Sequence, residues 1–196
     1  MRGGWRDRGH SQAPRSAARR HSVSFRNELL DRFTSWPARA ASYIRGVKVF
    51  QHQRHFRTSG GLEITDITDE VNQVVRDSGV RDGIACVYSP HTTCCVRVNE
   101  FESGFLEDFA TLLKRLVPSE SYYAHDDWDR RTENICPEDE EFGNGHSHCM
   151  SMLLGSAGES IPVTDGELCL GQWQRVLFME LDRERDRRWV VQVVGS

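Results

Sequence analysis

The chain has 196 residues, a net charge of −4 and an apolar fraction of 38%, values that fit one soluble folded domain of ordinary size. No apolar stretch approaches the ~20 residues that a bilayer-spanning helix needs, which argues against a membrane protein of that kind. The glycine-rich nucleotide-binding, kinase and G-x-S-x-G motifs are also missing, so none of these signatures assigns a reaction.

The first 46 residues differ from the others in charge. They hold ten Arg, no Lys and three acidic residues, so they carry about +7 while the other 150 residues carry about −11. The segment is rich in Ser, Ala and Gly and has few branched aliphatic residues, which predicts disorder or loose helix. We therefore predict an Arg-rich extension or targeting segment over 1–46 and one folded domain over 47–196.

Three interpretations of the extension stay open. Its composition is typical of an organelle transit peptide. Its charge would also suit nucleic acid, although the chain has no zinc or RNA-binding motif and the remainder is acidic. The third interpretation is an extension without a selected role. We expect a cytoplasmic protein that binds neither nucleic acid nor membrane, with an organelle as the alternative location if residues 1–46 are a transit peptide.

The folded part begins with residues that alternate between apolar and polar, which predicts a strand over 47–57. A helix follows, with Thr68 as its cap and Gly79 at its end. Short apolar runs predict strands over 83–88 and 94–99, on either side of a polar break. The first helix places these apolar residues on one stripe: Ile67, Val71, Val74 and Val75.

A second helix is expected from Ser103, a plausible cap, to the residue before Pro118, with basic residues in its last turn to match the helix dipole. Residues 118–145 form a long acidic connection, which is either functional or disordered. The apolar residues expected on the buried stripe of the second helix are Phe105, Phe109, Leu112, Leu113 and Leu116.

The last third of the chain reads mainly as β-structure. Residues 161–164 and 167–170 form a hairpin closed by the turn Asp165-Gly166, and we expect its second strand to continue to Leu181. A final strand covers 189–194. Strands predominate and helices are interspersed, so we predict a single α+β domain with a mostly antiparallel sheet and two to three helices.

Six cysteines are present, but none are spaced as CxxC, and the chain has no secretory signal. We therefore expect free thiols. Cys86, Cys94 and Cys169 lie in apolar runs, where a thiol packs as a small hydrophobic group. The neighbours Cys94 and Cys95 should point to opposite faces of one strand.

The stretch Asn144-Gly145-His146-Ser147-His148-Cys149 raises a question of geometry. In an extended chain His146 and His148 would share a face and could share a ligand, whereas in a helix they would diverge by about 200°. We predict that this stretch lies at the junction between a loop and a short helix over 150–154. Both imidazoles should then line a polar site, with His148 the closer.

Other polar residues fit a core poorly. His91-Thr92-Thr93 occupies the break between two strands, Asn99-Glu100 ends a strand, and His125-Asp126 lies in the acidic connection. A lone histidine in such a position is more often structural than functional. Together, however, the four histidines could bind a divalent ion or an anionic substrate, although their spacing is no standard zinc signature. The residues alone indicate a polar site lined by histidine.

These motifs occur in an order that resembles the YjbQ-like family, whose members are catalogued as secondary thiamine-phosphate synthases. The resemblance covers residues 47–195, and it rests on the combination, since each motif alone is weak. Many family members continue Asn-Glu with Asn and a nearby Asp, whereas this chain has Phe101, Glu102 and Ser103. The ordered motifs are HTT at 91–93, NE at 99–100, HD at 125–126, NGHSH at 144–148, LG at 154–155, IPV at 161–163 and GQWQ at 171–174.

The resemblance implies a compact α+β domain that forms a homotrimer, with the motif histidines gathered near a subunit boundary. It implies an enzyme that joins a pyrimidine diphosphate to a thiazole phosphate and releases pyrophosphate. The alternatives are a metal- or small-ligand-binding protein without synthase activity and a metal-assisted hydrolase. A small phosphorylated substrate is the expected partner, and a divalent ion (Mg or Zn) a possible cofactor.

The expected site residues follow from these motifs. The catalytic candidates are His91, His125 and His148. The candidate substrate-binding residues are Thr92, Thr93, Asn99, Glu100, Asn144 and Gln174. The candidate metal ligands are His125, Asp126, His146 and His148.

Overall fold

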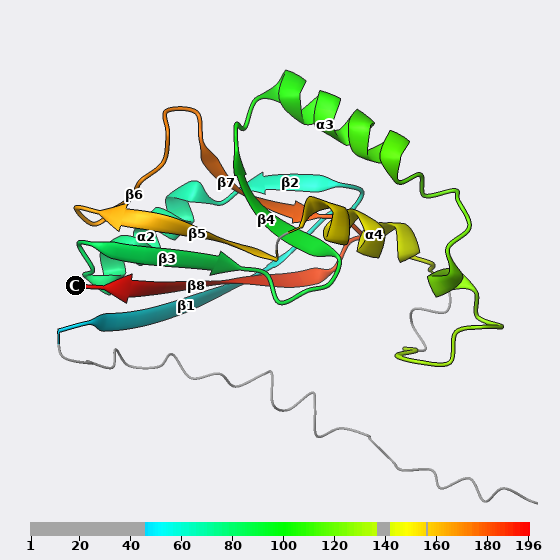
Figure 1. Ribbon diagram of the computed structural model, residues 1–196, viewed down its shortest axis with the longest axis horizontal. Helices are drawn as coiled ribbons and strands as arrows, with labels where there is room; N and C mark the ends of the chain where they lie inside the picture. Colours follow the sequence, from blue (N-terminus) through cyan, green and yellow to red (C-terminus); the bar gives the residue numbers. More distant parts are fainter. Residues whose placement is uncertain (1–45, 137–141, 156) are drawn as a thin grey trace, which may run out of the picture. The chain divides into compact units, whose positions relative to one another are not determined.

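The computed structural model describes residues 46–136, 142–155 and 157–196, which form an α+β domain with two curled antiparallel sheets (Figure 1). The Arg-rich extension lies outside these residues apart from Gly46, so its assignment stays a prediction. Within the described ranges no helix is long and apolar enough to cross a membrane.

The larger sheet has five strands in the order β1-β8-β3-β5-β6, and the smaller has three in the order β2-β7-β4. Neighbouring strands are antiparallel throughout. The turn Asp165-Gly166 between β5 and β6 has φ of 54° and 83°, which confirms the predicted hairpin. The strands are β1 (Lys48–Arg57), β2 (Glu63–Asp66), β3 (Gly83–Tyr88), β4 (Cys94–Asn99), β5 (Gly158–Thr164), β6 (Glu167–Leu168), β7 (Arg175–Glu180) and β8 (Asp186–Gly195).

Three α-helices and one short 3-10 helix complete the described fold: α2 (Thr68–Ser78), α3 (Ser103–Leu116), η1 (Ala124–Asp126) and α4 (Gly145–Leu154). The N-cap residues are Ile67 and Glu102, each one residue before the predicted caps Thr68 and Ser103. Asp66 accepts hydrogen bonds from the Thr68 backbone and hydroxyl, and Glu102 accepts from the first backbone N–H groups of α3. Gly79 ends α2 with φ of 64°, as predicted.

The apolar core falls into two clusters of buried side chains. The first lies between α2 and strands of both sheets, and it includes all four residues of the predicted α2 stripe. The second lies between the three-stranded sheet and helices α3 and α4. Cys94 belongs to the first cluster and Cys95 to the second, so these neighbours point to opposite faces of β4 as expected.

Three expectations about strand continuity and burial were wrong. The strand predicted over 167–181 is broken, because β6 ends at Leu168 and the chain then crosses to the other sheet as β7. Leu112 and Leu116 are 47% and 58% exposed, so α3 buries mainly Leu113 rather than a full stripe. Cys169 is also exposed, because it lies in the connection that leaves β6.

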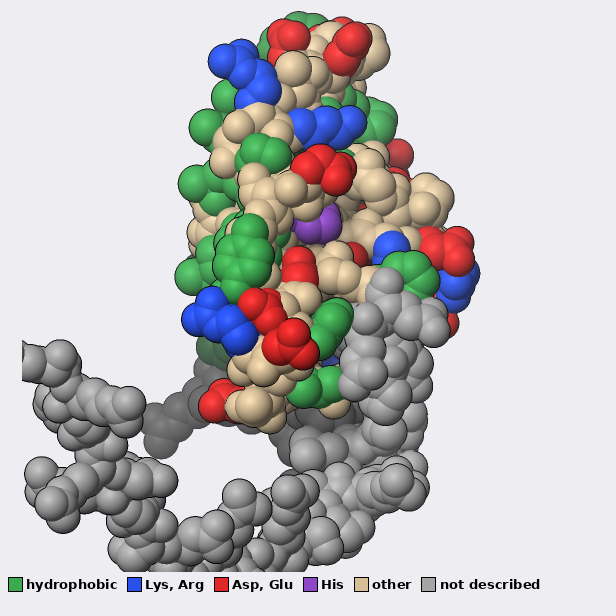
Figure 2. Space-filling view, turned by 90° about the vertical axis from the view of Figure 1, so that its right-hand side faces the viewer, with side chains coloured by type: hydrophobic (Ala, Val, Ile, Leu, Met, Phe, Trp, Pro, Cys, Tyr) green, Lys and Arg blue, Asp and Glu red, His purple; other side chains and the backbone are tan. Residues whose placement is uncertain are grey.

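One end of the fold gathers the polar motifs. There the chain enters β4, leaves β7, and passes through η1 into the first turn of α4 (Figure 1). The Leu181 backbone N–H donates to the Thr93 carbonyl, which holds the start of β4 beside the end of β7. Segments distant in sequence therefore meet at this end. Viewed from that side, a histidine lies recessed among charged side chains of both signs (Figure 2).

Candidate functional site

A cavity of about 670 Å³ lies at this end of the fold, and we call it the histidine pocket. Its walls come from the break before β4, from η1 and the residues after it, from the start of α4 and from the start of β8. It is lined by Pro90, His91, Thr92, Thr93, His125, Arg131, Glu133, Asn134, Asn144, His148, Arg185 and Arg187.

His91 is held by the backbone of β8. Its Nε2 accepts a hydrogen bond of 3.1 Å from the Arg188 backbone N–H, so in the neutral ring Nδ1 carries the proton. Burial, together with the positive charges of Arg187 and Arg188, lowers the pKa of His91 to about 4. At neutral pH His91 is therefore an uncharged imidazole. Its Nε2 is occupied by the Arg188 backbone N–H, and its Nδ1–H remains as a donor in the pocket.

The depressed pKa of His91 should make stability depend on pH. Between pH 6.5 and about 4 the unfolded chain takes up a proton at His91 that the folded chain does not, so acidification favours unfolding there. A His91→Gln variant lacks this contribution. We expect the stability advantage of wild type over the variant to fall by about 2 kcal/mol from pH 7.5 to pH 5. Urea unfolding at the two pH values measures this, and an unchanged difference would contradict it.

His125 and His148 form a pair across the pocket. Their ring centroids are 4.5 Å apart with an interplanar angle of 42°. Asp126 Oδ1 lies 3.0 Å from His125 Nδ1, and a carboxylate can only accept, so the tautomer that donates through Nδ1 leaves a lone pair on Nε2. Burial lowers the pKa of His148, and the neighbouring His125 and Arg131 lower it further. The lowered pKa favours the neutral form of His148, and the pair is placed to contact a bound molecule in the pocket.

Asp126 also fixes the start of α4. Its carboxylate accepts hydrogen bonds of 2.9 Å from the backbone N–H groups of Asn144 and Gly145, which would otherwise be unpaired at a helix N-terminus. The glycines make this approach possible. A Cβ on Gly143 would lie 2.7 Å from the Asp126 carboxyl carbon, and one on Gly145 would lie 2.6 Å from the Tyr123 Cβ. The glycine of the NGHSH motif is therefore explained by its close packing against Tyr123 and Asp126.

Two of the three pocket arginines are held by buried carboxylates. Arg187 forms an ion pair with the fully buried Glu180 and donates a 2.9 Å hydrogen bond to the Thr93 hydroxyl. Asp182 accepts from both Arg185 and Asn144 at 2.9 Å. These contacts orient four pocket residues: Thr93, Asn144, Arg185 and Arg187.

Arg131 differs from the other two arginines. Within the described residues it forms no ion pair, and it donates to the backbone carbonyls of His125, Glu133 and Asn134. Its guanidinium lies 5.3 Å from the centre of the Trp128 ring. Arg131 therefore brings a positive charge to the wall of the pocket that no carboxylate among the described residues neutralises directly.

The structure brings together six of the predicted site residues: His91, Thr92, Thr93, His125, Asn144 and His148 all line the histidine pocket. Asp126 does not line the pocket itself but forms a hydrogen bond with His125, which does. His146 does not join them. Because α4 already begins at Gly145, His146 and His148 lie in its first turn and face different cavities, which corrects the expectation that both line one site.

Three other predicted residues lie away from the pocket. Asn99 ends β4 and lines a separate groove beside α3. Glu100 follows it and is exposed. Gln174 accepts a hydrogen bond from the Gly171 backbone within the β6–β7 connection. Within one chain these three residues therefore do not contribute to the histidine pocket.

Sequence reasoning missed the arginines of the pocket. Arg185 and Arg187 lie in a run of alternating charges that is typical of a solvated turn, and Arg131 lies in the acidic connection. Glu180, within an otherwise apolar strand, was the one available signal. A carboxylate is rarely buried without a partner, so the position of Glu180 in an apolar strand indicates a nearby cation.

The described side chains of the pocket supply fewer ligands than a metal ion needs. Among the described residues no group of three or more His, Cys, Asp or Glu side chains is close enough to hold a metal. His125 and His148 offer two nitrogen ligands, and Asp126 already accepts from the α4 backbone. A metal at this pair would need its other ligands from water or substrate.

Comparison with known proteins sets this geometry in context. The profile of the family described as "UPF0047 protein YjbQ-like" matches residues 52–196, which include every motif of the histidine pocket. The chain belongs to the YjbQ-like family.

Relatives of this YjbQ-like protein match over most of its length. A UPF0047 protein of Archaeoglobus fulgidus is 39% identical, with 70% of this chain and 96% of that protein covered. One of Methanothermobacter thermautotrophicus is 36% identical, with 76% and 95% covered.

Solved structures support the fold. A YbjQ-like protein of Sulfolobus solfataricus, 29% identical, superposes with a TM-score of 0.62 over 76% of this chain and 99% of that one. A YjbQ/UPF0047 protein of Clostridium acetobutylicum, 31% identical, also has a TM-score of 0.62, over 72% and 98%. These relatives are named for no reaction or ligand, so the comparison establishes family and fold.

Proposed function

We propose that this YjbQ-like protein is an enzyme that binds a small phosphorylated substrate in the histidine pocket. The observation that carries the proposal is the meeting of three histidines and three arginines, from four separate segments, in one cavity. The specific reaction we propose is the one that the family resemblance implies. It joins a pyrimidine diphosphate to a thiazole phosphate to give thiamine phosphate and pyrophosphate.

The pocket offers hydrogen-bond donors suited to phosphate oxygens. Arg131 supplies a charge that is not neutralised by an ion pair with a described residue, and guanidinium groups match phosphate geometry. The Thr93 oxygen accepts from Arg187, so its own hydrogen is available to a ligand. The Nδ1–H of His91 adds a third donor. Together they can stabilise the charge that builds on a departing pyrophosphate.

In the proposed reaction a carbon–nitrogen bond forms as the carbon–oxygen bond to pyrophosphate breaks. No proton has to be removed from the attacking ring nitrogen, so the histidines act on the leaving group. His148 is placed to donate a hydrogen bond or a proton to its oxygens, and His125, oriented by Asp126, can donate as well when its Nε2 also carries a proton. His91, held by the backbone of β8, serves as a fixed donor.

A divalent ion would fit this chemistry by neutralising pyrophosphate charge. His125 and His148 are the described side chains that could hold it, with phosphate oxygens or water as the remaining ligands. The same facing pair favours a second candidate function, in which the protein binds a metal or small ligand or is a metal-assisted hydrolase. Elemental analysis of purified wild-type and His148→Ala protein separates the metal-dependent alternatives.

We also propose that the chain forms a homotrimer, as the resemblance implies. The exposed apolar side chains Leu112 and Leu116 of α3, with Met152 and Leu153 of α4, suit burial against another copy. Asn99, Glu100 and Gln174 could then approach the pocket of a neighbouring subunit. Light scattering in solution measures the assembly mass.

Purified full-length protein incubated with the pyrimidine diphosphate, the thiazole phosphate and Mg²⁺ tests the proposed reaction. We expect thiamine phosphate and pyrophosphate to appear in equal amounts, because one bond formed releases one pyrophosphate. Chromatography detects the first product and a phosphate assay the second. Release of phosphate or pyrophosphate without thiamine phosphate would favour the hydrolase and contradict the synthase.

A further inference from the structure

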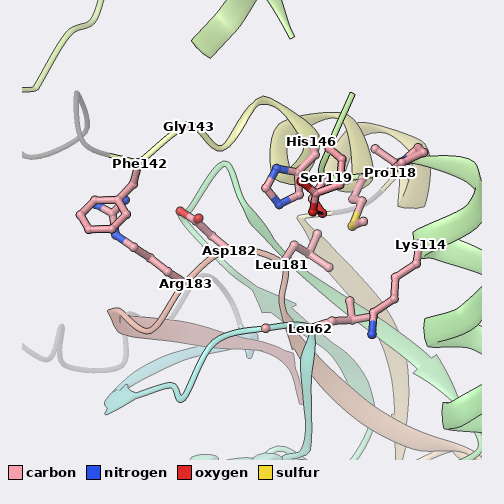
Figure 3. A pocket seen from close by; sticks show the side chains of 14 residues that line it. Leu62, Lys114, Pro118, Ser119, Phe142, Gly143, His146, Leu181, Asp182 and Arg183 are labelled. Carbon is pink, nitrogen blue, oxygen red and sulfur yellow. Dashed lines mark hydrogen bonds between the residues drawn. The ribbon is translucent and has the colours of Figure 1, made fainter. Parts of the chain in front are cut away.

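A second and larger cavity, of about 840 Å³, lies on the other side of the α4 N-terminus, and we call it the Lys114 cavity (Figure 3). It is formed by the β1–β2 connection, the end of α3, the start of α4 and the residues after β7. None of the reactions discussed above uses it. Its lining is largely apolar and includes Leu62, Val117, Pro118, Phe142, Met150 and Leu181.

Polar groups stand at defined places on this apolar lining. The His146 ring lies at the middle of the cavity, and Lys114 extends from α3 at the end away from Phe142 and Arg183 (Figure 3). Lys114 forms no hydrogen bond or ion pair with another described residue. The Ser147 hydroxyl lies 3.2 Å from His146 Nε2, which fixes the ring and leaves Nδ1 for a bound molecule. At the far end the Arg183 guanidinium lies 4.4 Å from the centre of the Phe142 ring.

The wall between the two cavities is narrow. Asp182 lines the Lys114 cavity, while the partners of its carboxylate, Asn144 and Arg185, line the histidine pocket. The first turn of α4 adds His146 on one side and His148 on the other. The lining holds two carboxylates, Asp182, which is paired with Arg185, and Glu120, which accepts a hydrogen bond from the Ser119 hydroxyl, and two cationic side chains, Lys114 and Arg183. Lys114, which pairs with no carboxylate among the described residues, favours an anionic group on a ligand at its end of the cavity.

We propose that the Lys114 cavity is a second ligand site, which takes an aromatic organic molecule carrying a single anionic group such as phosphate or carboxylate. The apolar wall covers the ring, and Lys114 and the His146 ring bind the anionic group. The site is separate from the histidine pocket, so both can be occupied at once. The inference does not depend on the reaction proposed above.

The probe for this site is 1-naphthyl phosphate, titrated by fluorescence into full-length protein. We expect it to bind, and to bind at least about tenfold more weakly to the Lys114→Glu variant, because an attractive contact is replaced by a repulsive one. The matched control Arg115→Glu makes the same charge change one residue away, outside the lining, and should bind as wild type does. His146→Ala should also weaken binding. Equal loss in the Lys114 and Arg115 variants would overturn the proposal.

Two further binding measurements test the nature of the site. Neutral 1-naphthol should bind more weakly than 1-naphthyl phosphate, and equal binding would overturn the role of the anionic group. Saturating pyrophosphate should not displace 1-naphthyl phosphate, and competition between them would place both in one pocket and overturn the second site. If wild type binds no pyrophosphate, the proposed function fails, while the variant comparison with 1-naphthyl phosphate still decides this inference.

Discussion

Replacing Glu180 by Gln is expected to lower the free energy of unfolding by about 3–5 kcal/mol, the scale for removing one partner of a buried ion pair. Glu180 is fully buried and accepts from Arg187 through both carboxylate oxygens, and also from the Thr58 hydroxyl and the Asp182 backbone N–H. The substitution leaves the buried Arg187 charge without its counter-ion. Denaturant unfolding followed by circular dichroism measures the loss.

Glu184→Gln provides the matched control. Glu184 is 64% exposed and pairs with the equally accessible Arg57, so its loss should cost less than about 1 kcal/mol. If the Glu180 and Glu184 variants are equally stable, the buried pair does not hold this end of the fold together. The position of Thr93 and Arg187 in the histidine pocket would then need another explanation.

In the proposed reaction, His148→Ala is expected to lower turnover by about 10²–10⁴-fold, the usual contribution of a general acid or base. His148 is only half-buried and lies at the pocket wall, so stability should change by less than about 1 kcal/mol. His55→Ala, on an exposed position of β1, removes an imidazole outside the pocket and should keep full activity. Steady-state rates and thermal unfolding of the three proteins give both quantities.

The opposite outcome for His148→Ala has a clear meaning. A large loss of stability with unchanged turnover would show that the His125–His148 contact is structural. The pair would then serve to pack η1 against α4.

Features set by local chemistry were predictable from sequence. The Asp165-Gly166 turn needs positive φ at two positions, which Asp and Gly tolerate, and the α2 stripe follows the helical period. Cys94 and Cys95 diverge because successive residues of a strand face opposite ways. The gathering of His91, His125 and His148 followed from the family resemblance, since the residues lie far apart in sequence.

Features set by small shifts or by tertiary packing were not predictable. A helix start placed a few residues too late reversed the relation of His146 and His148, because each helical residue turns the side chain by about 100°. The roles of Arg131 and Arg187 depend on tertiary contacts that no local pattern encodes, because Arg131, after η1, lines the same cavity as the start of β8, and Arg187 of β8 pairs with Glu180 of β7. Helix α3 has a helical apolar stripe, yet its exposed part has no partner among the described residues.

Calorimetric titration of pyrophosphate into full-length wild type, His148→Ala and His146→Ala tests the account most directly. It asks whether the histidine pocket, on one side of the α4 N-terminus, is where phosphorylated molecules bind. We predict binding to wild type, at least about tenfold weaker binding to His148→Ala, and unchanged binding to His146→Ala. No binding to wild type, or an equal loss in both variants, would contradict the account.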